Sequence, residues 1–260
     1  MKYILKSPEP DALRDYCAGV TGTWQSFTAD KTYGKVVDQL LLDQRGICAY
    51  CEVDLIISDG CGYSDLRVEH FHPKSDDHPK WTFKWQNLLL TCCGGNRDHL
   101  SSESGDRFTS PDHSCDVPKE DKILDGVIFH PSEQDRLRSL LFSYHMDGQM
   151  EVSEDCPEDL KDQALRTISE LRLSPERAAK KSKDTTPRLV RMRSAFLSGL
   201  QDQVQAFMED GLSTEQAMTV LAETLFPEDE EEDWTKFFSC ARWYLGPAAE
   251  DRLGKLGYLS

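Results

Sequence analysis

The sequence predicts an α+β, helix-rich fold made of two parts. Most of the cysteines lie before residue 116, interspersed with short strand-like segments. Residues 140–152 alternate like a β-hairpin, and from Cys156 onward signals for helix starts recur along the chain. We therefore expect a first domain over residues 1–125, with short strands and paired cysteines. Residues 126–260 should form a second domain, in which the hairpin is followed by a mainly α-helical interaction module.

Short elements are expected ahead of the first cysteine pair. Residues 1–5 fit a short strand, and residues 9–17 fit a helix. Residues 32–45 fit a stronger helix, because four apolar residues fall on one of its faces. Thr32 is the expected N-cap of this helix, and Gly46 lies where its end is expected. The four apolar residues are Val36, Val37, Leu40 and Leu41.

The second half carries clear turn and capping signals. Asp147-Gly148 supplies the turn residues between the two alternating segments of the hairpin. A long helix should begin after Thr186-Pro187 and end near Gly211. Ser213-Thr-Glu-Gln216 has the pattern of a capping box, and the helix that it starts should end at Phe226-Pro227.

The chain is strongly acidic, with a formal net charge of −16 at pH 7 over 260 residues. Affinity for nucleic acid comes largely from cations that displace counterions from phosphates, so this chain alone should bind nucleic acid poorly. If it acts on a nucleic acid, another subunit must bring the substrate. The acidic run Glu228–Asp233 is either a solvated segment or a docking surface for a basic partner.

One basic cluster stands out against this acidic background. It precedes and opens the long helix that is expected after Thr186-Pro187. The cluster is either a contact for nucleic acid or a solvated helix face that pairs with nearby acids. The candidate nucleic-acid-binding residues in it are Lys180, Lys181, Arg188 and Arg191.

Cysteine usage and hydropathy indicate the compartment. The chain has nine cysteines, an odd count that favours free thiols and zinc binding over a framework of disulfides. No segment has the length and apolar character of a transmembrane helix, and Met1-Lys2-Tyr3 does not open a signal peptide. We therefore expect a soluble, cytoplasmic protein without a membrane partner.

The paired cysteines are candidates for a structural zinc site. Cys48 and Cys51 form a C-x2-C knuckle, which is a common source of two zinc ligands. Cys92 and Cys93 are adjacent, so we expect one of them to be a ligand. Cys115 is the candidate fourth ligand. Taken alone, these cysteines are equally compatible with a redox motif or with reduced thiols packed as small apolar groups.

Glu69 and His70 are the candidate catalytic residues. They lie in a strand-like segment, where consecutive side chains point to opposite faces, so both can serve one site only at a bend or at the end of a strand. A carboxylate suits Mg²⁺, and an imidazole can take a proton from water. Metal and base together are sufficient for phosphodiester hydrolysis. The alternative is a surface strand with a solvated Glu and a structural His.

Three features of the first half resemble the HNH endonuclease family. Val68-Glu69-His70-Phe71-His72-Pro73 resembles the acid–His segment of that family, and Asn87-Leu88-Leu89 resembles its central Asn step. The cysteine frame resembles its zinc knuckles. The resemblance implies a ββα-metal core with a structural zinc site, in which two strands and a helix hold a catalytic metal.

The likeness is closer to the PtuB-type HNH subunit of Septu and of certain retron anti-phage systems. It rests on Met1–Lys6, Leu41–Glu52 and His113–Lys119, with a further helical segment at Leu171–Ser174. The HNH motif covers about the first half of the chain, and the PtuB likeness covers most of it.

The resemblance also implies roles for single residues. His70 corresponds to the general base that activates water, and Glu69 corresponds to a metal ligand. Asn87 corresponds to the residue that braces the ββα loop and keeps His70 oriented. By the same resemblance, Cys48 and Cys51 hold the structural zinc together with Cys92 and Cys115.

The last ligand of the catalytic metal has two candidate positions. In the family, the last ligand follows the second cysteine knuckle. If Cys115 ends that knuckle, the ligand is Asp116, which we favour because this register keeps four thiolates for zinc and supplies an oxygen ligand. If the knuckle begins at Cys92, the candidates are Asn96 and His99, which stay open as the alternative.

The resemblance implies Zn²⁺ as structural cofactor and Mg²⁺ or Mn²⁺ as catalytic cofactor. The expected activity is hydrolysis of DNA, as the effector of an anti-phage complex with a PtuA-like ATPase. One alternative is an effector that cleaves RNA, specifically tRNA, in a retron-type toxin complex with a reverse transcriptase and its DNA product. The other is a non-catalytic zinc adaptor, against which the intact Glu69-His70 and Asn87 argue.

Overall fold

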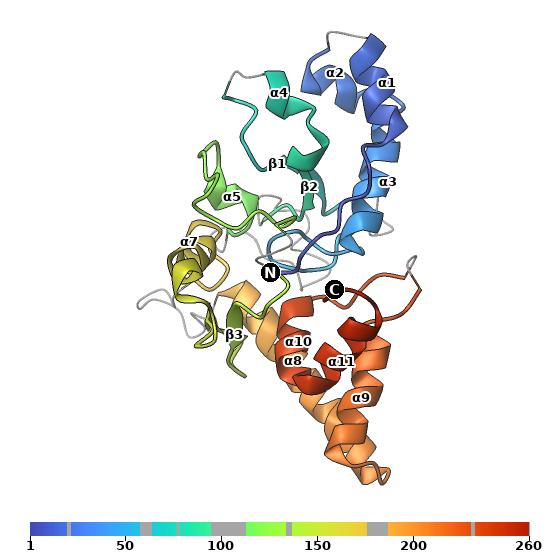
Figure 1. Ribbon diagram of the computed structural model, residues 1–260, viewed down its shortest axis with the longest axis vertical. Coiled ribbons are helices and arrows are strands. Elements are labelled where there is room, and N and C mark those ends of the chain that lie inside the picture. The colour runs from blue at the N-terminus through green and yellow to red at the C-terminus, as the bar shows by residue number, and fades with distance from the viewer. Residues whose placement is uncertain are drawn as a thin grey trace.

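The computed structural model describes residues 1–19, 22–57, 64–76, 79–94, 113–133, 137–175, 187–229 and 232–259. Over these residues the chain is helix-rich and contains two small antiparallel sheets, which confirms the predicted α+β class. The molecule is elongated, and both ends of the chain lie near its middle (Figure 1).

The elements divide between the two ends of the molecule. The upper part in Figure 1 and the adjoining middle contain α1 (Asp11–Gly19), α2 (Trp24–Thr28), α3 (Tyr33–Gln44), β1 (Arg67–His70), α4 (Pro79–Thr82), η1 (Trp85–Asn87), β2 (Leu88–Thr91) and α5 (Asp116–Lys119). The later elements are β3 (Phe142–Tyr144), β4 (Met150–Val152), η3 (Glu158–Leu160), α7 (Lys161–Glu170), α8 (Arg188–Glu209), α9 (Thr214–Leu225), α10 (Phe238–Leu245) and α11 (Pro247–Lys255).

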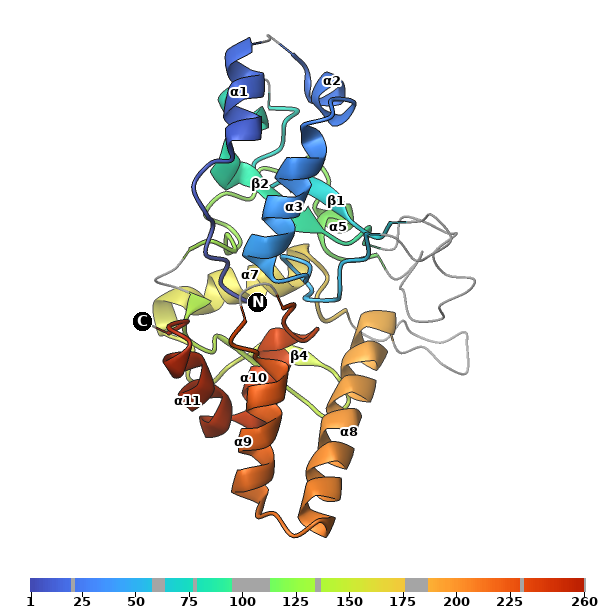
Figure 2. The same cartoon turned by 90° about the vertical axis from the view of Figure 1, so that its right-hand side faces the viewer.

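The antiparallel pair β1–β2 packs against α3 (Figure 2). Leu88 and Leu90 are buried in one apolar cluster with Val36 and Leu40 of α3. Because side chains alternate along a strand, Leu89 faces away from α3. Glu69 is paired with Leu89, so it faces away from α3 as well. The paired residues are Arg67–Thr91, Val68–Leu90, Glu69–Leu89 and His70–Leu88.

The last residue of α3 fastens the helix to β2. Gln44 is fully buried, and its Oε1 accepts a hydrogen bond from the Leu90 N–H at 2.7 Å. Its Nε2 donates to the Leu90 carbonyl at 2.8 Å, so the buried amide is satisfied at both ends. The chain then turns through Arg45 and Gly46, which have φ values of 56° and 73°. The predicted end of the helix is confirmed.

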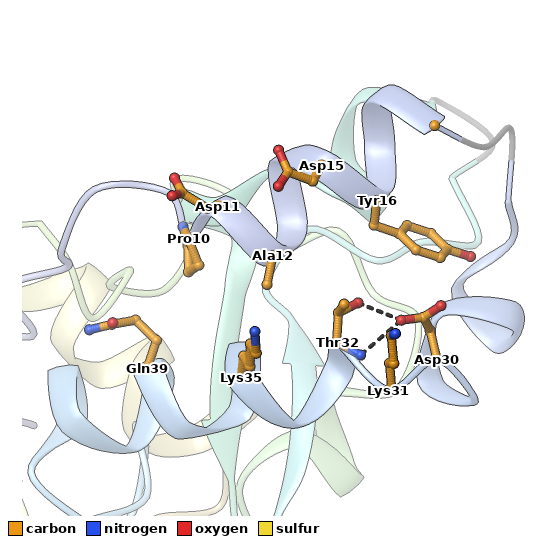
Figure 3. Close-up of a pocket in the computed structure, with 11 residues that line it drawn as sticks. Pro10, Asp11, Ala12, Asp15, Tyr16, Asp30, Lys31, Thr32, Lys35 and Gln39 are labelled. Atoms are coloured by element: carbon orange, nitrogen blue, oxygen red, sulfur yellow. Dashed lines mark hydrogen bonds between the residues drawn. The ribbon is translucent and has the colours of Figure 1, made fainter.

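The start of α3 differs from the prediction. The Thr32 side chain makes no capping hydrogen bond. Instead, the Asp30 carboxylate accepts hydrogen bonds from the Thr32 N–H at 2.8 Å and from its hydroxyl at 2.7 Å (Figure 3). A carboxylate is a stronger acceptor for these donors than a hydroxyl. Asp30 and Thr32 line a cavity of about 620 Å³ between α1 and α3, which Asp15 and Lys35 also line.

The predicted strand at residues 1–5 is wrong. No strand forms over residues 1–7, and the Ile4 N–H donates to the Pro131 carbonyl at 2.8 Å. The Lys6 ammonium donates to the carbonyls of Trp85 and Leu88 at 2.6 and 2.5 Å. A strand needs a neighbouring strand that offers a continuous row of partners. This segment finds single partners on separate elements instead.

The predicted hairpin and the capping box of the second half are confirmed. β3 and β4 are antiparallel, and α8 and α9 form a long helical hairpin (Figure 2). The Ser213 Oγ accepts from the Gln216 N–H at 3.2 Å, and the Gln216 Oε1 accepts from the Ser213 N–H at 2.8 Å. Helices α10 and α11 pack against α9. Among the described helices, none combines the length and apolar character needed to cross a membrane.

A buried carboxylate joins the first cysteine knuckle to the C-terminal helices. Glu52 accepts hydrogen bonds from the Ser239 N–H at 2.8 Å and from the Ser239 hydroxyl at 2.6 Å. One apolar cluster includes Cys48, Phe129 and Cys240, so residues from both predicted domains share a core. The predicted domain break near residue 125 itself stays a prediction.

Replacing this carboxylate should destabilise the protein. Glu52→Ala should lower the free energy of unfolding by about 2–4 kcal/mol, because Ser239 would lose its buried charged partner. Urea denaturation followed by circular dichroism measures the change. The control is Glu154→Ala at an exposed carboxylate, which should stay within about 0.5 kcal/mol of the unmodified chain. Equal stability of the two variants would contradict the assigned role of Glu52.

Candidate functional site

Four cysteines from three separate segments converge in the core. Cys48 and Cys51 follow α3, Cys92 follows β2, and Cys115 precedes α5. Their Sγ atoms all lie within 4.8 Å of one another. The Sγ–Sγ distances are 3.8 Å for Cys48–Cys115 and 3.6 Å for both Cys51–Cys92 and Cys92–Cys115.

This spacing fits a metal ion. Tetrahedral zinc with Zn–S bonds of about 2.3 Å places its sulfur ligands about 3.8 Å apart. A disulfide would require sulfur atoms only about 2 Å apart, and all four cysteines are free. The four buried cysteines could therefore bind a structural metal such as zinc.

Burial opposes ionisation of these thiols in the absence of a cation. Burial raises the pKa of Cys92 and Cys115 well above that of an exposed thiol. Burial opposes ionisation of Cys48 as well, but hydrogen bonds from the other three thiols lower its pKa well below the ordinary value. A central cation would stabilise all four thiolates at once, and zinc binds cysteine in that form.

Gly94 lets the chain pass close enough to bring Cys115 to this cluster. Its φ is +59°, and a side-chain Cβ there would lie 2.4 Å from the Ser114 carbonyl oxygen. The Ser114 N–H donates to the Gly94 carbonyl at 3.1 Å. Cys93, the alternative ligand, is not part of the cluster, and its N–H donates to the Asp65 carboxylate at 2.8 Å.

Beside the cysteine cluster, one face of β1 meets the single turn of α5. Arg67 and Glu69 share that face because they are two residues apart. Arg67 binds the Asp116 carboxylate through two nitrogens, at 2.5 and 2.7 Å. The Lys119 ammonium lies 2.8 Å from Glu69 Oε1. Opposite charges therefore pair twice across the strand and the helix.

The two carboxylates line one cavity together with His70. The cavity has a volume of about 320 Å³, and Arg67, Lys74 and Lys119 also line it. Burial raises the pKa of Glu69 to about 7, against the effect of the Lys119 ammonium, while the Asp116 carboxylate adds to the rise. The half-buried Glu69 and the buried Asp116 offer carboxylate oxygens, which are ligands that suit Mg²⁺ or Mn²⁺. The donor set thus fits a divalent cation, although Lys119 and Arg67 already pair with it.

His70 lies at the end of β1 and is among the residues that line the same cavity. It is 5% exposed, and the edge of its ring contacts Trp24 at a centroid distance of 4.4 Å. Burial lowers the pKa of His70 to about 4, so the imidazole is neutral at pH 7. Its Nε2 lies 3.0 Å from the Thr82 carbonyl oxygen. A neutral imidazole must donate to that acceptor, which leaves Nδ1 free to accept a proton.

Asn87 braces the loop that follows His70. Its Oδ1 accepts from the His72 N–H at 2.7 Å, and its Nδ2 donates to the His72 carbonyl at 3.0 Å. The same Nδ2 donates to the Trp81 carbonyl at 2.9 Å. The side chain therefore fixes backbone on both sides of the loop, and it is not among the residues that line the cavity.

His72 has a structural role that the sequence reasoning missed. Its ring nitrogens lie 2.8 Å from Asp125 and 2.9 Å from Asp76, and the ring stacks on Trp81. Burial alone would lower the pKa of His72, but hydrogen bonds to the two carboxylates outweigh it and raise the pKa. His72 stands within the acid–His segment, but nothing local in the sequence reveals its two partners. Arg67 and Lys119 were missed for the same reason.

The remaining predicted site residues fall into two groups. Asn96, His99, Lys180 and Lys181 lie outside the described residues. Arg188 and Arg191 belong to the first turn of α8 and do not line the cavity. Whether they contact nucleic acid stays a prediction.

The cysteine cluster predicts which substitution removes the metal. Cys115→Ser should lose most of the zinc that the purified chain carries and should unfold the first half, because structural zinc contributes folding free energy directly. Cys93→Ser is the matched control and should keep its zinc. Elemental analysis and thermal denaturation measure both effects. Full zinc content in Cys115→Ser, or loss of zinc from Cys93→Ser, would contradict this assignment.

The His72 contacts predict a pH-dependent stability. His72→Phe keeps a ring on Trp81 but removes both carboxylate contacts, so it should lower the free energy of unfolding by about 0.5–1 kcal/mol at pH 5.5. A raised folded-state pKa stabilises fully below the unfolded value of about 6.5, and this contribution disappears as the pH rises through the folded value. The loss should therefore shrink at pH 8.5.

Denaturation curves at both pH values measure this difference. The control is His145→Phe, because the pair that His145 forms with Glu151 is exposed on both sides. It should change stability little at either pH. A His72→Phe loss that grows with pH would have the wrong sign and would exclude this role for the carboxylate contacts.

No protein-family model matches the chain. Among curated proteins, the chain is similar to an Escherichia coli protein named "Retron Ec83 putative HNH endonuclease", with 36% identity over 133 residues. The match covers 47% of this chain and 48% of the relative, so the chain spans about half the length of the curated relative that it matches. The similarity supports the HNH resemblance of the sequence motifs, and the retron is named for the relative alone.

Proposed function

We propose that this chain is a metal-dependent HNH endonuclease subunit that hydrolyses phosphodiester bonds in DNA. One observation carries the proposal. Glu69, Asp116 and His70 line a single cavity, beside a cluster of four cysteines whose spacing fits zinc. Glu69 belongs to β1 and Asp116 belongs to α5. The elements β1, β2 and α5 follow one another in the order strand, strand, helix, which is the order that the ββα-metal resemblance implies.

In this proposal each residue has one task. Glu69 and Asp116 would hold Mg²⁺ or Mn²⁺, and such an ion stabilises the negative charge that develops on the phosphate. His70 accepts a proton from the attacking water at Nδ1, because its Nε2 proton is engaged by Thr82. Asn87 holds the loop after His70 in place through the His72 backbone.

The charge of the chain supports a second subunit. With a net charge of −16, the chain approaches a polyanion against its own field. We propose that a PtuA-like ATPase binds this subunit in the bacterial cytoplasm and supplies the positive surface. Part of the acidic run that we propose for docking is tied to the chain itself, because Arg45 donates to the carbonyls of Asp229 and Glu232 at 2.6 and 3.2 Å. Its side chains would form the docking surface.

A second candidate function follows from the name of the relative. That name refers to a retron, and the retron-type resemblance of the sequence implies a reverse transcriptase and its DNA product as candidate partners and tRNA as a candidate substrate. The same cavity chemistry hydrolyses either nucleic acid, so the substrate must be tested directly. A non-catalytic zinc adaptor is the remaining alternative.

The test is cleavage of DNA and of tRNA by the purified chain mixed with the product of its genomic neighbour, with Mn²⁺ or Mg²⁺. His70→Ala should lower the cleavage rate by about 10²–10⁴-fold, because the general base is lost. Glu69→Ala should abolish cleavage by weakening metal binding. Asn87→Ala should reduce both cleavage and stability. His113→Ala is the control, since His113 is not among the residues that line the cavity.

Each result discriminates among the candidates. Cleavage of DNA alone supports the first proposal, and cleavage of tRNA alone supports the second. No cleavage by a folded, partner-bound complex supports the adaptor. Asp116→Ala and Asn96→Ala should be compared by their cleavage rates. The variant that loses more activity identifies the last metal ligand. Wild-type activity in His70→Ala would exclude His70 as the base.

A further inference from the structure

Lys119 is a buried cation in the middle of the candidate site. Its side chain is 1% exposed, and its Nζ lies 2.8 Å from Glu69 Oε1 and 3.2 Å from the His70 carbonyl oxygen. Lysine is almost never fully buried unless it is paired. Its partner here is the carboxylate that, under the proposed function, would hold the catalytic metal.

Each of the two candidate metal-binding carboxylates already has a cationic partner. Arg67 pairs with Asp116 through two nitrogens, and Lys119 pairs with Glu69. A divalent ion added to this set would bring two further positive charges close to the buried ammonium. Coulomb repulsion between such charges is large where water is scarce. The metal and the ammonium are therefore poor simultaneous partners for one carboxylate.

The backbone of Lys119 is anchored, whereas its side chain can rotate toward other carboxylates. α5 is a single turn that directly follows Cys115. Cys115 is a member of the cysteine cluster, and its N–H donates to the Leu171 carbonyl at 2.9 Å. A displaced ammonium must therefore move by rotation of the side chain. Glu120 and Asp121 line the same cavity and offer it carboxylates.

We propose that the Lys119 ammonium and the catalytic metal compete for the Glu69 carboxylate, so that Lys119 limits metal loading of the free chain. This inference rests on the proposed function, because it takes Glu69 to be a metal ligand. The isolated subunit consequently binds Mn²⁺ weakly, which would help to keep a nuclease inactive until its substrate and partner are present.

The test is the affinity of the full chain for Mn²⁺, measured by electron paramagnetic resonance, with thermal denaturation as the check on folding. Lys119→Gln should bind Mn²⁺ at least about tenfold more tightly than the unmodified chain, which is a small part of the expected repulsion. The Gln amide can still donate to Glu69. Lys119→Arg keeps the charge and should bind as weakly as the unmodified chain.

Two further variants complete the comparison. Lys122→Gln is the matched control. Its Nζ lies 2.9 Å from the Glu170 carboxylate, and this exposed lysine does not line the cavity. It should leave the Mn²⁺ affinity unchanged. Adding Glu69→Gln to Lys119→Gln should abolish the gain, because the contested carboxylate is then removed.

The outcomes separate this inference from the proposed function. If Lys119→Gln binds Mn²⁺ no more tightly than the unmodified chain, competition is excluded while Glu69 stays a candidate ligand. If no variant binds Mn²⁺, both the competition and the catalytic metal site are excluded. A gain that persists without the Glu69 carboxylate would place the ion elsewhere and would overturn the inference.

A measurement on the unmodified chain does not depend on how the variants fold. Acetylation of lysines, followed by mass spectrometry, should show little reaction at Lys119 without metal, because the side chain is buried. Saturating Mn²⁺ should increase the reaction at Lys119 at least about tenfold and leave that at Lys122 unchanged, since the displaced amine leaves its buried ion pair. Unchanged protection of Lys119 in saturating Mn²⁺ would overturn the inference.

Discussion

The convergence of four cysteines within 4.8 Å of one another is the constraint on which the rest of the site depends. It holds together the end of α3, the end of β2 and the start of α5. A helix of one turn is far too short to be stable alone, so α5 needs such an anchor. Since β1 pairs with β2, the same anchor sets the distance between β1 and α5. The cysteine cluster thus fixes the relative positions of the elements that form the candidate catalytic site.

Charge pairing determines the rest of the cavity. Burying Glu69 and Asp116 close together is costly unless cations accompany them. Lys119 and Arg67 provide these cations from the opposite element in each case. These two ion pairs are neutral, so the net charge of −16 comes from the rest of the chain. This distribution agrees with a subunit that depends on a partner to approach nucleic acid.

The loop after β1 is held by polar side chains rather than by regular structure. Asn87 binds the backbone of His72 and Trp81, and the His72 ring is held between the carboxylates of Asp76 and Asp125. Such networks are stiff only when every member is satisfied. The His70 ring, which precedes this loop, lies with its Nε2 3.0 Å from the Thr82 carbonyl oxygen.

The sequence by itself determined the local elements and the residue types of the site. The helix over residues 33–44, the hairpin at 142–152 and the capping box at Ser213 follow from periodicity and caps, which neighbouring residues encode. The strand expected at residues 1–5 failed because strand formation needs a distant partner. The sequence resemblance already placed Cys115 in the cysteine cluster, which the structure brings together, whereas the tertiary structure alone decided that Arg67 pairs with Asp116 across 49 positions of sequence. It also decided which cations and carboxylates share the cavity, because such contacts depend on how distant segments pack, and no local pattern encodes that.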